Sequence, residues 1–177
     1  YKKDYIKAET YYKKSISLDG NKPEPHNNLG SLYKTIDKPK DALKSFQRAI
    51  DIDSNFVYAY HNIGNIYTSM GRFEDAKIYF KKSIKISPLY SNSHRTLSRI
   101  IKYKKNEEHF ENLKKIYPKI KNKNIDDKVN ISFALGKAYE DIKDYKKSYF
   151  HYEEANANYN KRINYSIKNE YGKFDKI

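Results

Sequence analysis

The sequence predicts an all-α fold, a superhelical solenoid of antiparallel helix pairs. The first observation behind this prediction is a 34-residue period, in which the run LGSLY at 29–33 returns as IGNIY at 63–67. A fixed period in this range is typical of stacked supersecondary units that are covered by their neighbours instead of by one central core. The second observation is that apolar residues in each period form two stripes at helical spacing, separated by a break.

The chain begins with one helix of this pattern instead of two. Ala8 and Tyr12 precede Ala42 and Phe46 by 34 positions. Residues 1–20 therefore align with the second apolar stripe only. We expect them to be the second helix of a truncated repeat whose first helix lies before the first residue.

The next repeat is expected at residues 23–56. Pro23 suits the start of a helix, where a missing N–H group costs little. The break at 37–39 ends the first stripe, and Asp37 can cap the helix that follows. The second stripe contains Ala42 and Phe46 at a spacing of four, which places them on one helix face.

The next repeat is regular, and the repeats after residue 90 are less so. Residues 57–90 have the same layout, with Gly71 in the turn and Pro88 after the end. Residues 91–124 form a degenerate repeat with an insertion of four, and Phe110 is expected to push its two helices apart. A repeat with an extended last helix follows at 126–160, and a capping helix or linker at 161–177. All of these segments are expected to form one solenoid domain over residues 1–177.

Small and aromatic residues recur where the helices should pack. We expect Gly30 and Gly64 to lie where Ala42 and Ala76 approach, and the phenylalanines to fill the space between one hairpin and the next. The expected packing positions are Ala8, Ala42, Ala76, Gly30, Gly64, Gly136, Tyr33, Tyr67, Tyr139, Phe46, Phe80 and Pro88.

These residues resemble the tetratricopeptide repeat, whose signature W-x2-L-G-x2-Y, A-x3-F and P spans 34 residues. The match is good over 23–56 and 57–90 and poor over 91–124. The positions of the family's Trp hold His26, Tyr60, His94 and Ser132. The resemblance implies a right-handed superhelix whose first helices line a concave face that binds extended peptides.

A narrower resemblance lies in the last repeat. The runs at 133–141, 144–152 and 155–156 are similar to the final repeat before the catalytic domain of bacterial tetratricopeptide–sulfotransferase fusion proteins. That resemblance implies a downstream domain that binds phosphoadenylyl sulfate. This chain would then be its substrate- or partner-recruiting region. The chain reaches Ile177 before any Gly-rich phosphate loop, so no catalytic residue is carried over.

Composition narrows the class of protein. The chain has no Cys, which fits a reducing, cytoplasmic environment, and no apolar run long enough for a transmembrane helix or a signal peptide. The net charge of +14 invites a nucleic-acid partner. However, 31 of the 36 basic residues are Lys. Phosphate and base readers favour Arg for its planar fork, so a solvated basic surface is the preferred interpretation.

No motif for catalysis, a cofactor or a metal is present. The six glycines are scattered, so no phosphate-binding loop can form. His26, His61 and His94 recur near the repeat period, but translation along a solenoid separates them too far to share one metal ion. We therefore expect no enzyme activity in this chain, no cofactor and no metal.

The exposed positions of the first helices are the candidate binding site for a protein or an extended peptide. Asn28 and Asn62 lie one period apart and should form a ladder of amides that pair with a peptide backbone. Arg95, Arg99 and Lys102 should lie on one helix face and favour acidic groups. The candidate peptide-binding residues are Asn28, His61, Asn62, Asn65, Arg95, Arg99 and Lys102. Ordinary solvated helix positions are the alternative.

Three functions remain open. The chain is a peptide-binding scaffold or self-associating adaptor, a structural extension of an enzyme, or an RNA-binding helical repeat. RNA-reading repeats use two or three side chains for each base, and the groove residues here show no such code. A nucleic-acid partner is therefore disfavoured, and no membrane partner is expected.

Overall fold

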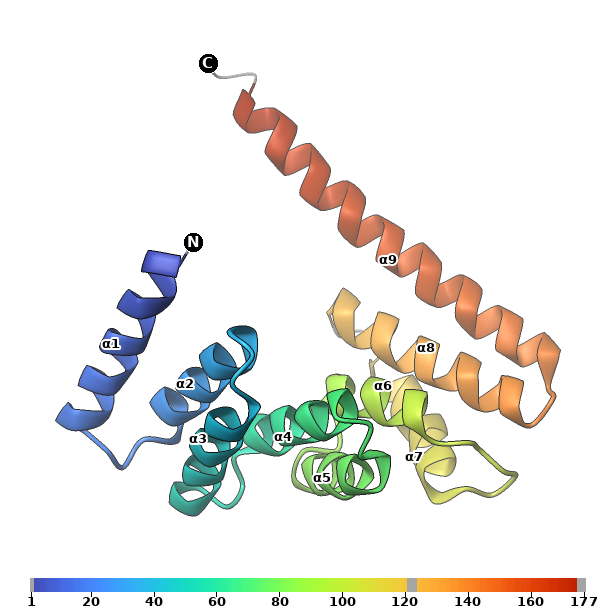
Figure 1. Cartoon of the computed structure of the whole chain (residues 1–177). Helices are drawn as coiled ribbons and strands as arrows, with labels where there is room; N and C mark the ends of the chain where they lie inside the picture. Colours follow the sequence, from blue (N-terminus) through green and yellow to red (C-terminus); the bar gives the residue numbers. More distant parts are fainter. Residues whose placement is uncertain (1, 121–123, 175–177) are drawn as a thin grey trace. The chain divides into compact units, whose positions relative to one another are not determined.

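The computed structural model describes residues 2–120 and 124–174, and the side chains of residues 4–120 and 124–163. These residues are helical, with no strand among them (Figure 1). The helices are α1 (Lys2–Leu18), α2 (Pro23–Thr35), α3 (Pro39–Ile52), α4 (Val57–Ser69), α5 (Phe73–Ile86), α6 (Ser91–Ile100), α7 (Glu108–Ile116), the short 3-10 helix η1 (Tyr117–Ile120), α8 (Ile125–Asp141) and α9 (Tyr145–Phe174).

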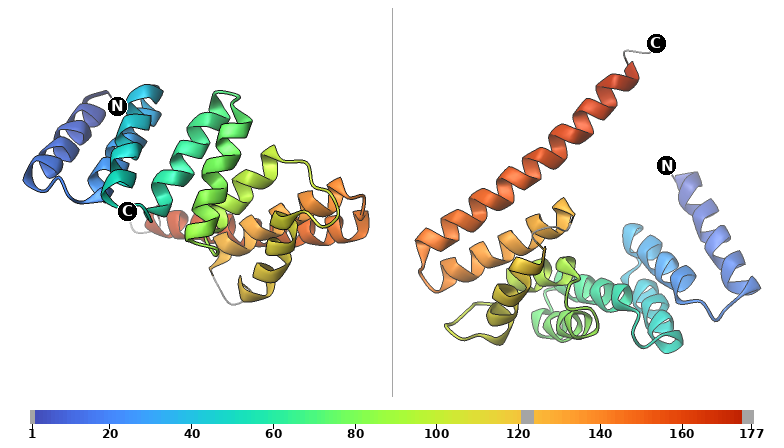
Figure 2. Two further views of the ribbon diagram at one scale, coloured as in Figure 1. Left: turned by 90° about the horizontal axis from the view of Figure 1, so that it is seen from below. Right: turned by 180° about the vertical axis from the view of Figure 1, so that it is seen from behind.

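The chain divides into two compact units, where the sequence predicts a single domain. The first unit is Tyr1–Ser87 and the second is Pro88–Ile177. In the first unit α2 pairs with α3 and α4 with α5, α1 packs against α2, and α3 packs against α4 (Figure 2). The predicted all-α architecture of antiparallel helix pairs is confirmed.

The hairpin turns share one backbone geometry. Asp37, Gly71 and Lys143 each adopt the left-handed conformation, with φ of 56°, 71° and 64°. The next N–H group donates to a carbonyl five residues earlier, from Lys38 to Tyr33 at 2.8 Å, from Arg72 to Tyr67 at 2.9 Å and from Asp144 to Tyr139 at 2.9 Å. This is a Schellman ending, which satisfies carbonyls that the helix leaves unpaired. The recurring tyrosines therefore mark the end of each first helix.

The recurring glycines lie opposite aromatic rings. A methyl group added at Gly30 would lie 2.7 Å from the Phe46 ring, and one at Gly64 would lie 2.6 Å from the Phe80 ring. At Gly136 the facing ring is Tyr152, at 2.7 Å. The rings are therefore the groups nearest to Gly30 and Gly64, a contact that the sequence analysis did not identify. Phe46 also packs in one core with Ile63 of the next hairpin.

The degenerate repeat is arranged differently from the others. In the second unit α6 packs along α8 and not closely against α7, whereas α7 packs against η1 and α8. Phe110 is buried in a core with Tyr103, Leu113 and Leu135. A bulky ring at a position that is small in other repeats fits this separation of α6 from α7.

The last helix is longer than its partner. α9 runs without interruption from Tyr145 to Phe174, whereas α8 ends at Asp141. A separate capping helix or linker was the prediction for 161–177. The described part of that segment, residues 161–174, continues α9 instead, and residues 175–177 lie outside the described residues.

A buried chain of hydrogen bonds connects α6 to α7. His94 contacts the carbonyl of Pro88 through Nε2 at 2.9 Å and His109 through Nδ1 at 2.9 Å. The other ring nitrogen of His109 lies 2.8 Å from the hydroxyl of Tyr103. A carbonyl can only accept, so His94 Nε2 carries a hydrogen. His109 Nε2 then donates to His94, and the Tyr103 hydroxyl donates to His109.

The three residues of this hydrogen-bonded chain are buried. His94, His109 and Tyr103 are 0%, 5% and 2% exposed. Burial lowers the pKa of His94, although the bond to the Pro88 carbonyl opposes the shift.

We predict that Gly64→Ala destabilises the first unit by about 1–3 kcal/mol, because the added methyl group overpacks against Phe80. Alanine is the better helix former, so this loss opposes a propensity gain of about 1 kcal/mol. Chemical denaturation measures the change. The double variant Gly64→Ala/Phe80→Leu should recover part of the loss. Additive single effects would contradict a direct contact.

We also predict that acid weakens the second unit. The folded-state pKa of His94 lies below its ordinary value, so the unfolded chain binds more protons once the pH falls below about 6.5. The stability that neutral His94 provides is therefore present above that pH and lost as the pH falls through the folded-state pKa. The loss is at most about 1.4 kcal/mol per pH unit for each proton taken up on unfolding. Replacing both His94 and His109 by Leu should reduce the slope of unfolding free energy against pH. An unchanged slope would contradict the prediction.

Candidate functional site: the first-helix surface

The candidate site in the first unit is formed by α2 and α4. We call it the amide surface and define it as Asn27, Asn28, Ser31, Lys34, Tyr58, His61, Asn62, Asn65 and Thr68. Helical spacing places these residues on the side of α2 and α4 that does not contain the buried Leu29 and Ile63.

Within the amide surface, Asn62 is bonded to the neighbour of Asn28. Asn62 Nδ2 donates to Asn27 Oδ1 at 3.0 Å, whereas Asn28 is exposed. Successive helical residues point about 100° apart, so only one of the two neighbours can face the adjacent helix. Asn27 faces α4 and Asn28 faces solvent. The pairing of Asn28 and Asn62 with a peptide backbone stays a prediction, and the structure adds the bond between Asn27 and Asn62.

His61 and Asn65 lie one turn apart on α4 and are joined at 3.0 Å between His61 Nε2 and Asn65 Nδ2. An amide nitrogen can only donate, so the imidazole accepts through Nε2. Burial, together with the charge of Lys34, lowers the pKa of His61 to about 4. His61 is therefore neutral at pH 7, and its ring lies 5.7 Å from that of Phe80.

The basic cluster predicted in the second unit is not a single surface. Because α6 ends at Ile100, Lys102 lies outside the helix, and its expected position one turn beyond Arg99 is lost. The guanidinium of Arg95 lies 3.7 Å from the centre of the Phe133 ring, and burial lowers its pKa. Arg99 and Lys102 are exposed. Arg95 thus stacks on α8, and the three residues do not form the predicted anion site.

The residues at the family's Trp position make one recurring contact. His26 Nε2 lies 3.4 Å from the carbonyl of Gly20, and the Tyr60 hydroxyl donates to the carbonyl of Ser54 at 3.1 Å. His94 Nε2 reaches Pro88 in the same way, and each carbonyl lies six residues before its ring. His26 and His94 therefore each have a nearby backbone carbonyl as a hydrogen-bond partner. No group of three His, Cys, Asp or Glu side chains that could hold a metal ion occurs among the described residues.

Sequence reasoning missed a pocket in the second unit, near Ser132. The signal was available, because Ser132 is the one small residue among the four that replace Trp.

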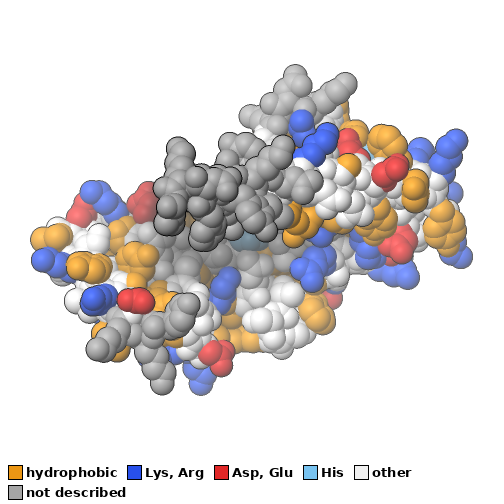
Figure 3. All heavy atoms as spheres, turned by 90° about the horizontal axis from the view of Figure 1, so that it is seen from above, with side chains coloured by type: hydrophobic (Ala, Val, Ile, Leu, Met, Phe, Trp, Pro, Cys, Tyr) orange, Lys and Arg blue, Asp and Glu red, His pale blue; other side chains and the backbone are white. Residues whose placement is uncertain are grey.

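On the face drawn in Figure 3, Lys and Arg side chains are scattered among acidic and apolar ones. Within the residues that the structure describes, no helix is both long and apolar enough to cross a membrane.

Two family models match parts of this chain. A model described as "Tetratricopeptide repeat" matches residues 1–22 and 57–88, and one described as "TPR repeat" matches residues 38–71. No curated protein sequence gives a match.

Several solved structures share the fold. A crystal structure of MamA has a TM-score of 0.64 at 22% identity, with 92% of this chain and 93% of that chain covered. Pseudomonas aeruginosa pilF has a TM-score of 0.67 at 16% identity, with coverage of 89% and 70%. The second TPR domain of human RPAP3, in complex with an HSP70 peptide, has a TM-score of 0.51 at 26% identity, with coverage of 56% and 82%.

The matched residues include the second copy of the 34-residue motif, with Gly64, and both ring residues Phe46 and Phe80. Tetratricopeptide repeats therefore make up residues 1–22 and 38–88 of this chain.

Proposed function

We propose that this chain is a non-catalytic protein-interaction scaffold whose amide surface binds an extended segment of a partner protein. The observation that carries the proposal is the bond between Asn27 and Asn62, which holds amide groups of two successive first helices together. The RPAP3 domain with a similar fold was solved with a bound peptide, which supports this class of partner.

The amide surface has groups that suit a peptide backbone. Asn62 uses one N–H of its amide on Asn27 and keeps a second N–H and a carbonyl lone pair. Asn28 and Lys34 are exposed, and Tyr58 is 51% exposed. Amides both donate and accept, so they can pair with the N–H and C=O groups of an extended chain without selecting its side chains.

The wider predictions concern the protein to which this scaffold belongs. Recruitment of substrates or partners to a sulfotransferase domain is supported by the resemblance of residues 133–156. A reading frame that continues beyond Ile177 into a strand and a Gly-rich phosphate loop would test it. A free-standing or self-associating adaptor is the alternative, and cytoplasmic localisation stays a prediction from composition.

Peptides selected from a random display library on the intact chain provide the test. We predict that Asn62→Ala lowers the affinity for the selected peptides by about 2- to 10-fold. This is the loss expected for a hydrogen bond worth about 0.5–1.5 kcal/mol. Asn28→Ala should add to this loss. Fluorescence anisotropy measures the affinity, and far-UV circular dichroism should show unchanged helix content.

Asn156→Ala is the matched control, because Asn156 is an exposed asparagine on α9 in the other unit. Its affinity should equal that of the unmodified chain. Equal affinity of the Asn28/Asn62 double variant would reject the amide surface as the site. If single-stranded RNA bound more tightly than any selected peptide, with the steep salt dependence of phosphate contacts, the RNA-binding alternative would replace the proposal.

A further inference from the structure

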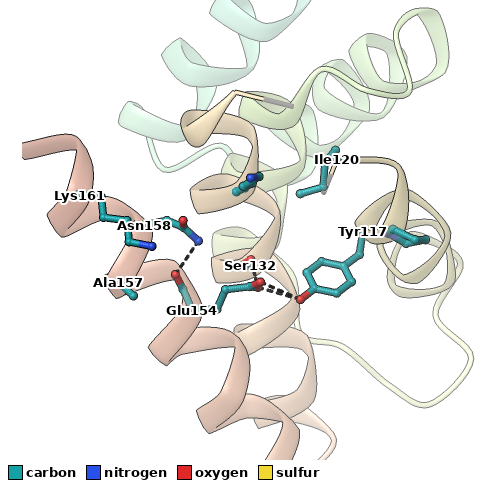
Figure 4. Close-up of a pocket in the computed structure, with 9 residues that line it drawn as sticks. Tyr117, Ile120, Ser132, Glu154, Ala157, Asn158 and Lys161 are labelled. Atoms are coloured by element: carbon teal, nitrogen blue, oxygen red, sulfur yellow. Dashed lines mark hydrogen bonds between the residues drawn. The ribbon is translucent and has the colours of Figure 1, made fainter. Parts of the chain in front are cut away.

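The second unit contains a pocket of about 670 Å³ that the proposed peptide-binding function does not use (Figure 4). Tyr117 and Ile120 of η1 form one side, Ser132 of α8 the floor, and Glu154 and Lys161 of α9 the opposite side. Ligand pockets in proteins commonly have volumes of about 300–1,000 Å³.

The pocket arises from a change at two repeat positions. In the α4–α5 hairpin, Tyr60 has its ring 5.9 Å from Lys82 Nζ. The equivalent positions 72 residues later hold Ser132 and Glu154, whose side chains form a hydrogen bond of 2.6 Å. The small serine leaves space where the other repeats have a ring. Tyr117 enters from η1 and takes part of that space, with its ring 4.9 Å from His151.

The α9 side of the pocket carries a carboxylate that two hydroxyl groups hold in place. The Tyr117 hydroxyl lies 2.9 Å from each oxygen of Glu154, and Ser132 donates to Oε2. Burial, reinforced by the bond to Glu154, raises the pKa of Tyr117 to about 12, so this hydroxyl remains a donor. A carboxylate can accept about four hydrogen bonds. Glu154, whose side chain is 33% exposed, therefore keeps acceptor capacity toward the pocket.

The other end of the pocket is positive. Lys128 lies one turn from Ser132 on α8, and Lys161 lies two turns from Glu154 on α9. Two turns correspond to about 10 Å along the helix axis. Among the described residues neither lysine has an ion-pair partner, whereas the neighbouring Arg162 is neutralised by Asp126 at 2.6 Å. The pocket thus has one negative and one positive end.

Apolar groups separate these two ends. Pro118 and Ile120 line the η1 side, and Ala157 lies between Glu154 and Lys161 along α9. A simple cation would be repelled by the lysines and a simple anion by Glu154. A ligand with both charges about 3 Å apart, plus two hydrogen bonds of about 2.9 Å, would span most of the distance between the ends.

We propose that this pocket binds a small zwitterion of the α-amino acid class with an apolar side chain. The ammonium group binds Glu154, the carboxylate binds Lys128 and Lys161, and the side chain lies against Ile120 and Ala157. This site is separate from the amide surface, and it does not depend on the proposed peptide-binding function.

Isothermal titration calorimetry of the intact chain with L-leucine tests the proposal. Two matched probes each lack one charge: 3-methylbutylamine has only the ammonium, and 4-methylpentanoate has only the carboxylate. We expect L-leucine to bind, and each single-charge probe to bind at least about tenfold more weakly, as for the loss of a charged hydrogen bond. Equal binding of either probe, or no heat of binding with millimolar L-leucine, would overturn the proposal.

Variants locate the site. Glu154→Gln and Lys161→Gln should each lower the affinity for L-leucine at least about tenfold. The control variants Glu153→Gln and Lys146→Gln, at exposed positions on α9, should leave this affinity unchanged. Ala157→Phe fills the pocket without removing any of its hydrogen bonds, so it should abolish binding while the thermal melt is preserved. L-Leucine binding that survives Ala157→Phe or Glu154→Gln would place the ligand elsewhere and overturn the proposal.

Discussion

The contact between a glycine on the first helix and an aromatic ring on the second is the constraint on which each regular hairpin depends. Gly30, Gly64 and Gly136 each leave less than 3 Å between an added methyl group and the facing ring. The ring can then lie inside the hairpin, where Phe46 and Phe80 are fully buried. The same close approach sets the direction in which the first helix presents its other side chains. The positions of Asn27 and Asn62 on their shared surface follow from it.

Departures from this contact produce the special features of the second unit. The third repeat has no glycine opposite a ring, and α6 is connected to α7 by His94 and His109 instead of by close helix packing. In the last repeat the glycine contact is kept, but Ser132 is small where other repeats have a ring. The repeat scaffold therefore survives, and a polar pocket opens beside it. A single small residue at position 132 is thus enough to open a pocket without disturbing the repeat.

The comparison of sequence and structure separates two kinds of prediction. Periodicity predicted which segments pair and where the turns lie, because apolar spacing and turn residues are local properties of the chain. It did not show that the Phe46 ring lies nearest to Gly30, or that Asn27 bonds to Asn62. Ala42 and Phe46 share one helix face, so spacing alone does not decide which of them lies nearer. Asn27 and Asn28 point about 100° apart, and packing decides which of them meets the next helix. The basic cluster failed because α6 ends at Ile100, a boundary that no strong signal in the sequence marks.

The amino-acid sequence by itself determined the all-α repeat, the helix pairs and the chemical character of the first-helix surface, since these depend on residue type and spacing. Only the tertiary structure decided that Asn27 pairs with Asn62, that Arg95 stacks on Phe133, and that Tyr117, Ser132 and Glu154 meet in one pocket. These contacts join residues 22 to 38 positions apart. Their formation depends on helix rotation and length, which are set by packing between helices and not by any local signal in the chain.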